Sequence, residues 1–301
     1  MRTVCKQLTS TGTPVTQMQL MPTKSARFAG LVEFRDGVAP RPRLSLRLAV
    51  FDFDGTLSWL RHGWPELMCE VFLPYYPMRA EESVAEVRRV LVAEILSGNG
   101  LPSIFQMRKF VERVQARHVK APAPEELLQE YQSRLDQIIA ERTDMILRQT
   151  ASSYDFVVFG ARAMLELLEQ RGVKLYVLSG TLEERVKQEA NLLDLARYFG
   201  GRIFGSPPDS APFSKRAVLD RILAEEKLRG ENLLCFGDGP VEIFHARELG
   251  GLAVAVASDE DVHGSGRMDA VKRTQLIDAD AHVVIPDYRD AAALLDALFH
   301  D

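Results

Sequence analysis

Seven residues that could bind a phosphate group or a metal ion stand where apolar segments end or where helices are expected to begin. They are Asp52, Asp54, Ser179, Gly180, Lys215, Asp238 and Glu242. An ionised carboxylate at the end of a buried strand is costly unless a cation pairs with it. Asp52 and Asp54 are only two residues apart, so a bound divalent ion would relieve this cost for both.

Taken one at a time, most of these residues also have a purely structural explanation. Asp-Gly after an apolar run is a common turn signal, and it occurs twice here. Thr181 followed by Glu184 fits a capping box that only starts a helix. Lys215 fits a solvated helical lysine, and Glu242 fits a first-turn glutamate that the helix dipole favours. Asp52, inside the run VFDFDG, is the hardest of them to explain in this way.

The elements that must position these residues alternate between strand and helix patterns. A strand is predicted in the run LRLAVFDFDGT, and residues 157–159 lead into a helix over 161–170. Further strands are predicted at 173–178, 202–204, 232–236, 252–256 and 281–285, and further helices at 182–195, 214–228 and 241–249. Continuous apolar strands separated by helices are typical of a parallel sheet covered on both faces. Ligands bind beyond the carboxyl ends of such strands, so the polar residues are expected to meet at one rim.

The segment between the first strand and this alternating part shows only helical patterns. Apolar residues recur at helical spacing over 84–95 and again, over a longer span, over 128–145. Pro65, Pro102 and Pro124 each stand where a helix could begin. This pattern predicts an all-helical insert of about a third of the chain.

The sequence resembles the haloacid dehalogenase-like (HAD) superfamily of phosphohydrolases. DFDGT, a strand ending in Ser-Gly, a lysine and GDGPVE follow one another in that order, from about Leu46 to the C-terminus. The helical insert resembles the C1-type cap of phosphoglycolate phosphatase and β-phosphoglucomutase, and GDGPVEIFHARELGGLAVAVASDE is similar to the fourth-motif region of that subgroup. The resemblance implies an α/β fold with a Rossmann-like parallel-sheet core, formed by 46–57 and 154–301, and an inserted helical cap over 58–153.

The resemblance also implies a role for each matching residue. Asp52 would be the nucleophile that forms an aspartyl-phosphate, and Asp54 the general acid and base. Ser179 and the amide of Gly180 would hold phosphoryl oxygens. Lys215 would neutralise phosphate charge and restrain Asp52.

Mg²⁺ is the cofactor that the resemblance implies, with Asp52, Asp54, Asp238 and Glu242 as its ligands. Asp54 would contribute its main-chain carbonyl, and Glu242, where the family often has Asp, would act through a metal-bound water. All-oxygen ligands suit Mg²⁺, which keeps several waters and screens the repulsion between an anionic nucleophile and a phosphate ester. An acid at position 54 favours an oxygen leaving group over a halide, hence a phosphatase or a phosphomutase.

The start of the insert departs from the family pattern because it is basic and aromatic. Arg61 and His62 are candidates for contact with the leaving group or with a second anionic group of the substrate. The structural alternative is that Trp59 and Trp64 pack the hinge of the cap and that Arg61 pairs with a cap glutamate.

Composition limits the partners. The 301 residues include 37 Lys and Arg against 42 Asp and Glu, a net charge of −5, which argues against nucleic acid or an anionic membrane as partner. No apolar stretch approaches the length of a membrane span. Three widely separated cysteines without a Cys-x-x-Cys pair favour a reducing, cytoplasmic setting.

Residues 1–45 lie outside the family resemblance and are expected to form a partly disordered tail or arm. Residues 31–44 fit a short hairpin or an extended arm. The first residues could be a tail, a transit peptide, or sequence upstream of a true start at Met18 or Met21.

Together these features predict a Mg²⁺-dependent phosphatase acting on a small organic phosphomonoester such as a sugar phosphate, as a monomer or homodimer. The alternatives are a phosphomutase of the β-phosphoglucomutase type and a catalytically silent HAD-like binding protein.

Overall fold

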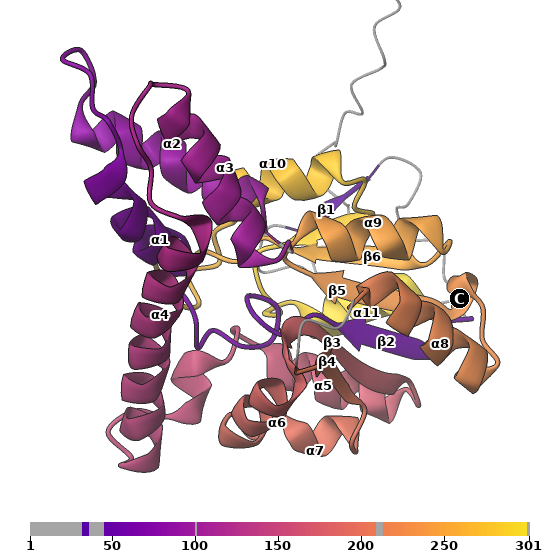
Figure 1. The fold of residues 1–301 in the computed structure, drawn as a ribbon. Helices are drawn as coiled ribbons and strands as arrows, with labels where there is room; N and C mark the ends of the chain where they lie inside the picture. The colour runs from indigo at the N-terminus through magenta and orange to yellow at the C-terminus, as the bar shows by residue number, and fades with distance from the viewer. Residues whose placement is uncertain (1–31, 36–44, 100, 209–212, 300–301) are drawn as a thin grey trace, which may run out of the picture.

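Seven strands form one sheet in a computed structural model that describes residues 32–35, 45–99, 101–208 and 213–299. The strand order is β1-β7-β6-β5-β2-β3-β4, and β1 alone runs antiparallel to its neighbour, β7 (Figure 1). The strands are β1 (Glu33–Phe34), β2 (Leu48–Phe51), β3 (Lys174–Leu182), β4 (Ile203–Ser206), β5 (Leu233–Gly237), β6 (Leu252–Val256) and β7 (Val283–Ile285). This confirms the predicted α/β class.

The chain reverses its direction of travel across the sheet between β2 and β5. From β2 it proceeds outward through β3 and β4, and it then returns to β5 on the other side and continues through β6 to β7. Phe51 of β2 lies opposite Phe236 of β5, and the two rings stack with centroids 4.5 Å apart. The carboxyl ends of β2 and β5 are therefore level, at the switch point where such sheets bind ligands.

Helices cover both faces of the sheet because the central strands are buried on both sides. Ala49 and Phe51 of β2 face one hydrophobic cluster with α5 (Ala161–Gln170), α6 (Glu183–Leu192), α7 (Ala196–Phe199) and α11 (Ala291–Phe299). Leu48 and Val50 face a second cluster with α8 (Lys215–Glu226), α9 (Pro240–Glu248) and α10 (Ala270–Asp278). This two-sided burial explains why the strands are apolar without alternation.

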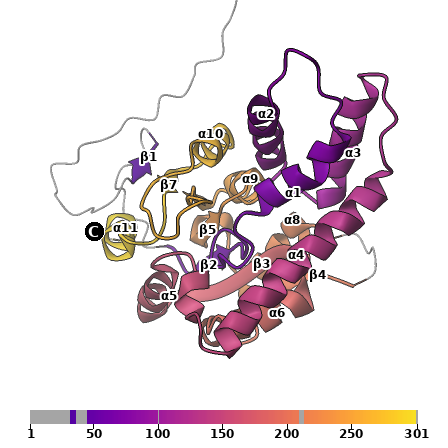
Figure 2. The ribbon, with the colours of Figure 1, turned by 90° about the vertical axis from the view of Figure 1, so that its left-hand side faces the viewer.

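Four α-helices between β2 and α5 form a helical cap beside the sheet (Figure 2). They are α1 (Trp64–Phe72), α2 (Val84–Ser97), α3 (Ser103–Gln115) and α4 (Pro124–Leu147), and the short 3₁₀ helices are η1 (Leu73–Tyr75), η2 (Ser153–Phe156) and η3 (Gly230–Asn232). A third hydrophobic cluster, whose buried residues all lie within 67–131, holds the cap together. The helical cap is confirmed, while its limits at 58 and 153 stay a prediction.

The strand β3 is longer than the sequence pattern predicts. It continues to Leu182, so Ser179 lies within the strand, and its pairing with β4 shifts in register between Leu178 and Leu182. The helix α6 starts at Glu183 without a side-chain cap, so the capping-box interpretation of Thr181 was wrong. Residues 157–159, which precede α5, contribute only a single bridge, from Val157 to Ser58.

Part of the predicted N-terminal arm joins the sheet. Glu33–Phe34 pairs with β7, and Arg273 of α10 donates to the Glu33 carboxylate at 2.9 Å. The predictions for 1–31 and 36–44, including those about the start site, lie outside the described residues. Within the described ranges, no helix has both the length and the apolar character needed to cross a membrane.

Candidate active site

The first part of the site is a buried lysine between two carboxylates. Asp52 directly follows β2, Lys215 is the first residue of α8, and Glu242 lies in the first turn of α9. The Lys215 ammonium donates to Asp52 Oδ1 at 2.9 Å and also to Glu242 Oε1. None of the three residues is more than 9% exposed. The structure thus brings Asp52 and Glu242 into contact with Lys215, from which they are 163 and 27 positions apart in the sequence.

Burial and neighbouring charges act against each other in this cluster. Burial raises the pKa of Asp52 to about 8 despite the opposing effect of Lys215, and Glu242 and Asp238 add to the rise. Burial lowers the pKa of Lys215, but the carboxylates of Asp52 and Glu242 outweigh it and hold the pKa above its ordinary value. The lysine is therefore held in its charged form. In formal charges, one ammonium between two carboxylates leaves one negative charge uncompensated.

The second part is another buried lysine, which the sequence analysis missed. Lys272 of α10 is 1% exposed; its ammonium lies 3.1 Å from Asp238 Oδ2 and also pairs with Glu260. Burial raises the pKa of Asp238, Lys272 lowers it, and Glu260 and Glu242 raise it further. Glu260 follows the end of β6 by four residues, so its place after a strand is a signal that the sequence carries, whereas nothing in the spacing of Lys272 marks it.

Gly55 allows the two strand ends to approach each other. Its φ of 72° lies in the left-handed region, and a Cβ at this position would overlap Asp238 Oδ2. A residue with a side chain would therefore clash with Asp238 as well as strain the backbone.

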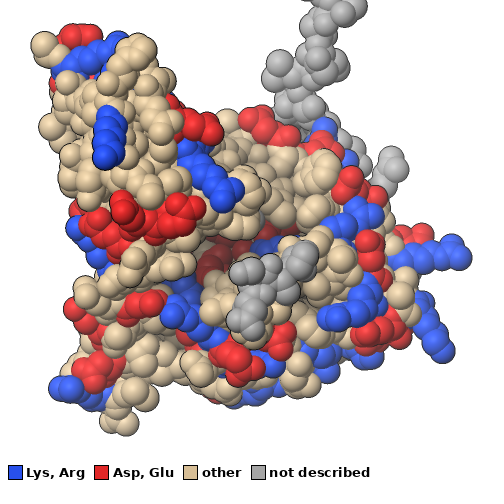
Figure 3. Space-filling view, in the orientation of Figure 1, with Lys and Arg blue, Asp and Glu red and all other residues tan. Residues whose placement is uncertain are grey.

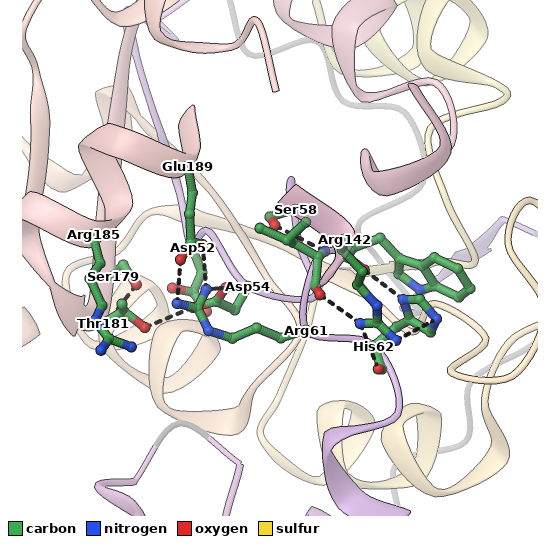
Figure 4. Close-up of polar contacts among 12 residues, drawn as sticks. Asp52, Asp54, Ser58, Arg61, His62, Arg142, Ser179, Thr181, Arg185 and Glu189 are labelled. Atoms are coloured by element: carbon green, nitrogen blue, oxygen red, sulfur yellow. Dashed lines mark hydrogen bonds and ion pairs between the residues drawn. The ribbon is translucent and has the colours of Figure 1, made fainter. Parts of the chain in front are cut away.

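Asp54 is held by residues from the cap linker and from β3 (Figure 4). Thr181 donates its hydroxyl to Asp54 Oδ2 at 2.8 Å, and Arg61 pairs with Oδ1. The Arg61 guanidinium is held in turn by two hydrogen bonds of 2.6 Å to Glu189 of α6. Arg61 therefore reaches the site, paired with a glutamate as the structural alternative supposed, although Glu189 belongs to a sheet-covering helix and not to the cap. Thr181 and Glu189 were missed because only the fold brings them to Asp54.

His62 points away from this cluster. Its ring stacks on Trp59 with centroids 3.7 Å apart, and its nitrogens are engaged by the Trp59 carbonyl and by Arg142 at 3.0 Å (Figure 4). Burial lowers the pKa of His62. The structure does not bring His62 to the site as a substrate contact, and its role here is to pack the linker.

The phosphate-binding candidates lie next to these groups. Ser179 is 1% exposed, and its hydroxyl accepts a hydrogen bond from the Thr181 amide at 3.1 Å. A Cβ on Gly180 would have Lys215 Cε as its nearest neighbour, at 3.9 Å, so this backbone borders the lysine side chain. The space-filling view shows acidic and basic atoms on the floor of a hollow between the cap and the sheet (Figure 3).

The charges of the site fit a divalent cation. Asp52, Glu242, Asp238 and Glu260 are four buried carboxylates facing the two buried ammonium groups of the lysines, which leaves two formal negative charges. No three acidic, histidine or cysteine side chains within the described ranges form a complete metal cage. Mg²⁺ does not require one, because it binds through one or two carboxylates and keeps its waters. Asp52 and Asp238 are a pair of buried carboxylates that could hold it in this way.

Comparison with known proteins places the chain in a family. Residues 46–250 match the model of haloacid dehalogenase-like hydrolases. No curated protein sequence matches the chain.

Many solved structures match this chain, and three of them show the shared fold. A proposed β-phosphoglucomutase from Thermotoga maritima is 17% identical with a TM-score of 0.52, covering 84% of this chain and 100% of its own. A predicted phosphoglycolate phosphatase from Haemophilus somnus is 15% identical with a TM-score of 0.54, covering 83% and 98%. A HAD family hydrolase from Deinococcus radiodurans, solved with bound phosphate and sodium, is 14% identical with a TM-score of 0.53, covering 84% and 97%.

Proposed function

Because the chain belongs to the haloacid dehalogenase-like hydrolase family, we propose that it is a Mg²⁺-dependent phosphatase that hydrolyses a small organic phosphomonoester. The observation that carries the proposal is the buried contact of Lys215 with Asp52 at the switch point of the sheet. This contact places a fixed positive charge beside a carboxylate that lies where the fold binds ligands, as phosphoryl transfer to that carboxylate requires.

The reaction would proceed in two steps on this chain's own residues. An oxygen of the Asp52 carboxylate attacks phosphorus, the ester P–O bond breaks, and Asp54 gives a proton to the leaving oxygen. A water then attacks phosphorus in the aspartyl-phosphate and passes a proton to Asp54, and the bond between phosphorus and the Asp52 oxygen breaks, so that inorganic phosphate leaves and the Asp52 carboxylate is restored. Ser179, the Gly180 amide and Lys215 would hold the phosphoryl oxygens in both steps.

Asp52 and Asp238 would hold Mg²⁺, together with the main-chain carbonyl of Asp54 and with Glu242 through a water. When bound, the ion neutralises the charge between the ester and the nucleophile. The raised pKa values of Asp52 and Asp238 support this assignment, because burial raises both despite the neighbouring lysines, and a bound cation would favour the charged carboxylates.

The substrate side of the proposal rests on Asp54 and Arg61. A proton donor at Asp54 suits an oxygen leaving group such as that of a sugar phosphate. Arg61 lies beside Asp54 and stays the candidate for contact with the leaving group. Its guanidinium already forms ion pairs with Asp54 and Glu189. We further propose a cytoplasmic enzyme, monomeric or homodimeric, that acts on a small molecule and not on nucleic acid or a membrane.

A phosphate-release screen tests the function. Purified protein with Mg²⁺ is incubated with sugar phosphates, nucleotides and phosphoglycolate, and free phosphate is measured with and without EDTA. We expect release from at least one ester and its loss on chelation, with recovery when excess Mg²⁺ is added. Isomerisation of a sugar phosphate without release would support a phosphomutase instead, and no reaction across the panel would support a silent binding protein.

A further inference from the structure

The proposed mechanism gives Lys272 no role, yet Lys272 is one of the most buried charged side chains among the described residues. Its ammonium contacts Asp238 Oδ2 at 3.1 Å, pairs with Glu260, and lies 3.4 Å from the Ser258 hydroxyl. A lysine is almost never buried to this degree unless it is fully paired. Its position in α10 brings a fixed positive charge directly against one proposed metal ligand.

The two oxygens of Asp238 have different surroundings. Oδ2 receives both Lys272 and the side-chain amide of Asn99, which reaches over from the cap at 3.2 Å. Within the described ranges, no hydrogen bond or ion pair of this kind ends on Oδ1. The carboxylate is thus held in one orientation through Oδ2, while Oδ1 stays available for a cation.

We infer that Lys272 is a positioning residue that orients Asp238 and at the same time competes with Mg²⁺ for its negative charge, so that the Lys272–Glu260 pair sets the affinity of the site for the ion. The inference rests on the proposed function only through Mg²⁺ binding at Asp52 and Asp238. Lys272 weakens binding because like charges repel strongly in a buried site, and Glu260 offsets part of this repulsion.

Charge-changing variants separate this role from a merely structural one. Lys272→Met leaves three uncompensated carboxylate charges in place of two, so Mg²⁺ should bind more tightly, on the order of tenfold to a hundredfold. Glu260→Gln removes a negative charge, while the ion pair between Lys272 and Asp238 stays in place. Mg²⁺ should therefore bind several-fold more weakly. The double variant restores the net charge of the natural site and should bind Mg²⁺ with nearly the natural affinity.

The measurement is a Mg²⁺ titration of each full-length protein by calorimetry, with the Mg²⁺-dependent rise in melting temperature as a second readout. Lys174→Met is the control, because Lys174 is half-exposed and pairs with Glu226 at the far end of β3. Should Lys272→Met fail to fold, Glu260→Gln and the double variant still decide the question. Weaker binding by Lys272→Met, or equal binding by the natural protein, Glu260→Gln and the double variant, overturns the inference.

The same titration distinguishes this inference from the proposed function. A natural protein that binds no Mg²⁺ overturns the proposed metal dependence and the inference with it. A natural protein that binds Mg²⁺ with variants that do not follow the change in charge overturns the inference alone.

Discussion

Replacing Asp52 by asparagine is expected to abolish turnover, by roughly 10⁴-fold or more, in a protein that stays folded. The asparagine amide cannot act as the nucleophile. Its side chain has nearly the same size and shape as that of aspartate, so it fits the same buried position after β2. Stability should be unchanged or higher, because burial holds the pKa of Asp52 at about 8 and the neutral side chain avoids that desolvation cost. Lys215 keeps its second partner, Glu242.

Phosphate release and urea-induced unfolding measure the two effects of Asp52→Asn separately. Asp136→Asn is the matched control, because Asp136 is about half exposed and pairs with Arg185 outside the site. Activity of Asp52→Asn within tenfold of the natural protein would defeat the nucleophile assignment.

Replacing Lys215 by methionine should remove both activity and a large part of the stability. Lys215 is 9% exposed and pairs with Asp52 and Glu242, so its loss leaves two buried carboxylates without their cation. Breaking a buried ion pair by removing one partner costs about 3–5 kcal/mol. The free energy of unfolding from a urea titration should fall by that order, and phosphate release should be lost.

A second variant separates charge from packing at this position. Lys215→Met with Glu242→Gln removes one positive and one negative charge, so it should recover part of the lost stability without recovering activity. A Lys215→Met protein as stable and as active as the natural one would show that the ion pairs of Lys215 contribute little to the fold and nothing to the reaction.

The sheet and its order of elements could be predicted because β2, β5 and β6 are buried on both faces. Such strands are continuous apolar runs, and the sequence shows them directly. The extension of β3 to Leu182 could not be predicted, because Ser179, Gly180 and Thr181 are turn-like residues that lie in an irregular stretch between two pairings with β4, those of Leu178 and Leu182. Tertiary pairing here overrides local preference.

The site residues also divide into those that the sequence could predict and those that it could not. Asp52, Lys215 and Glu242 were predicted to meet because strand ends and helix starts converge at one rim of a parallel sheet, and the structure brings them into contact. Lys272 and Glu189 lie within helices, where a lone charged residue usually faces water, so only the folded arrangement distinguishes them. His62 shows the opposite case, since a basic residue close to the first motif in sequence turns away from it in the structure.

The most direct test of the account is to find the phosphoryl group on the enzyme. The natural protein, supplied with Mg²⁺ and acetyl phosphate, is quenched in acid during turnover and reduced with borohydride, which converts an aspartyl-phosphate to homoserine, and the peptide around position 52 is then examined by mass spectrometry. The account predicts homoserine at position 52 in the natural protein and none in Asp52→Asn. Homoserine at another aspartate, or turnover of acetyl phosphate with no modified aspartate at all, would contradict it.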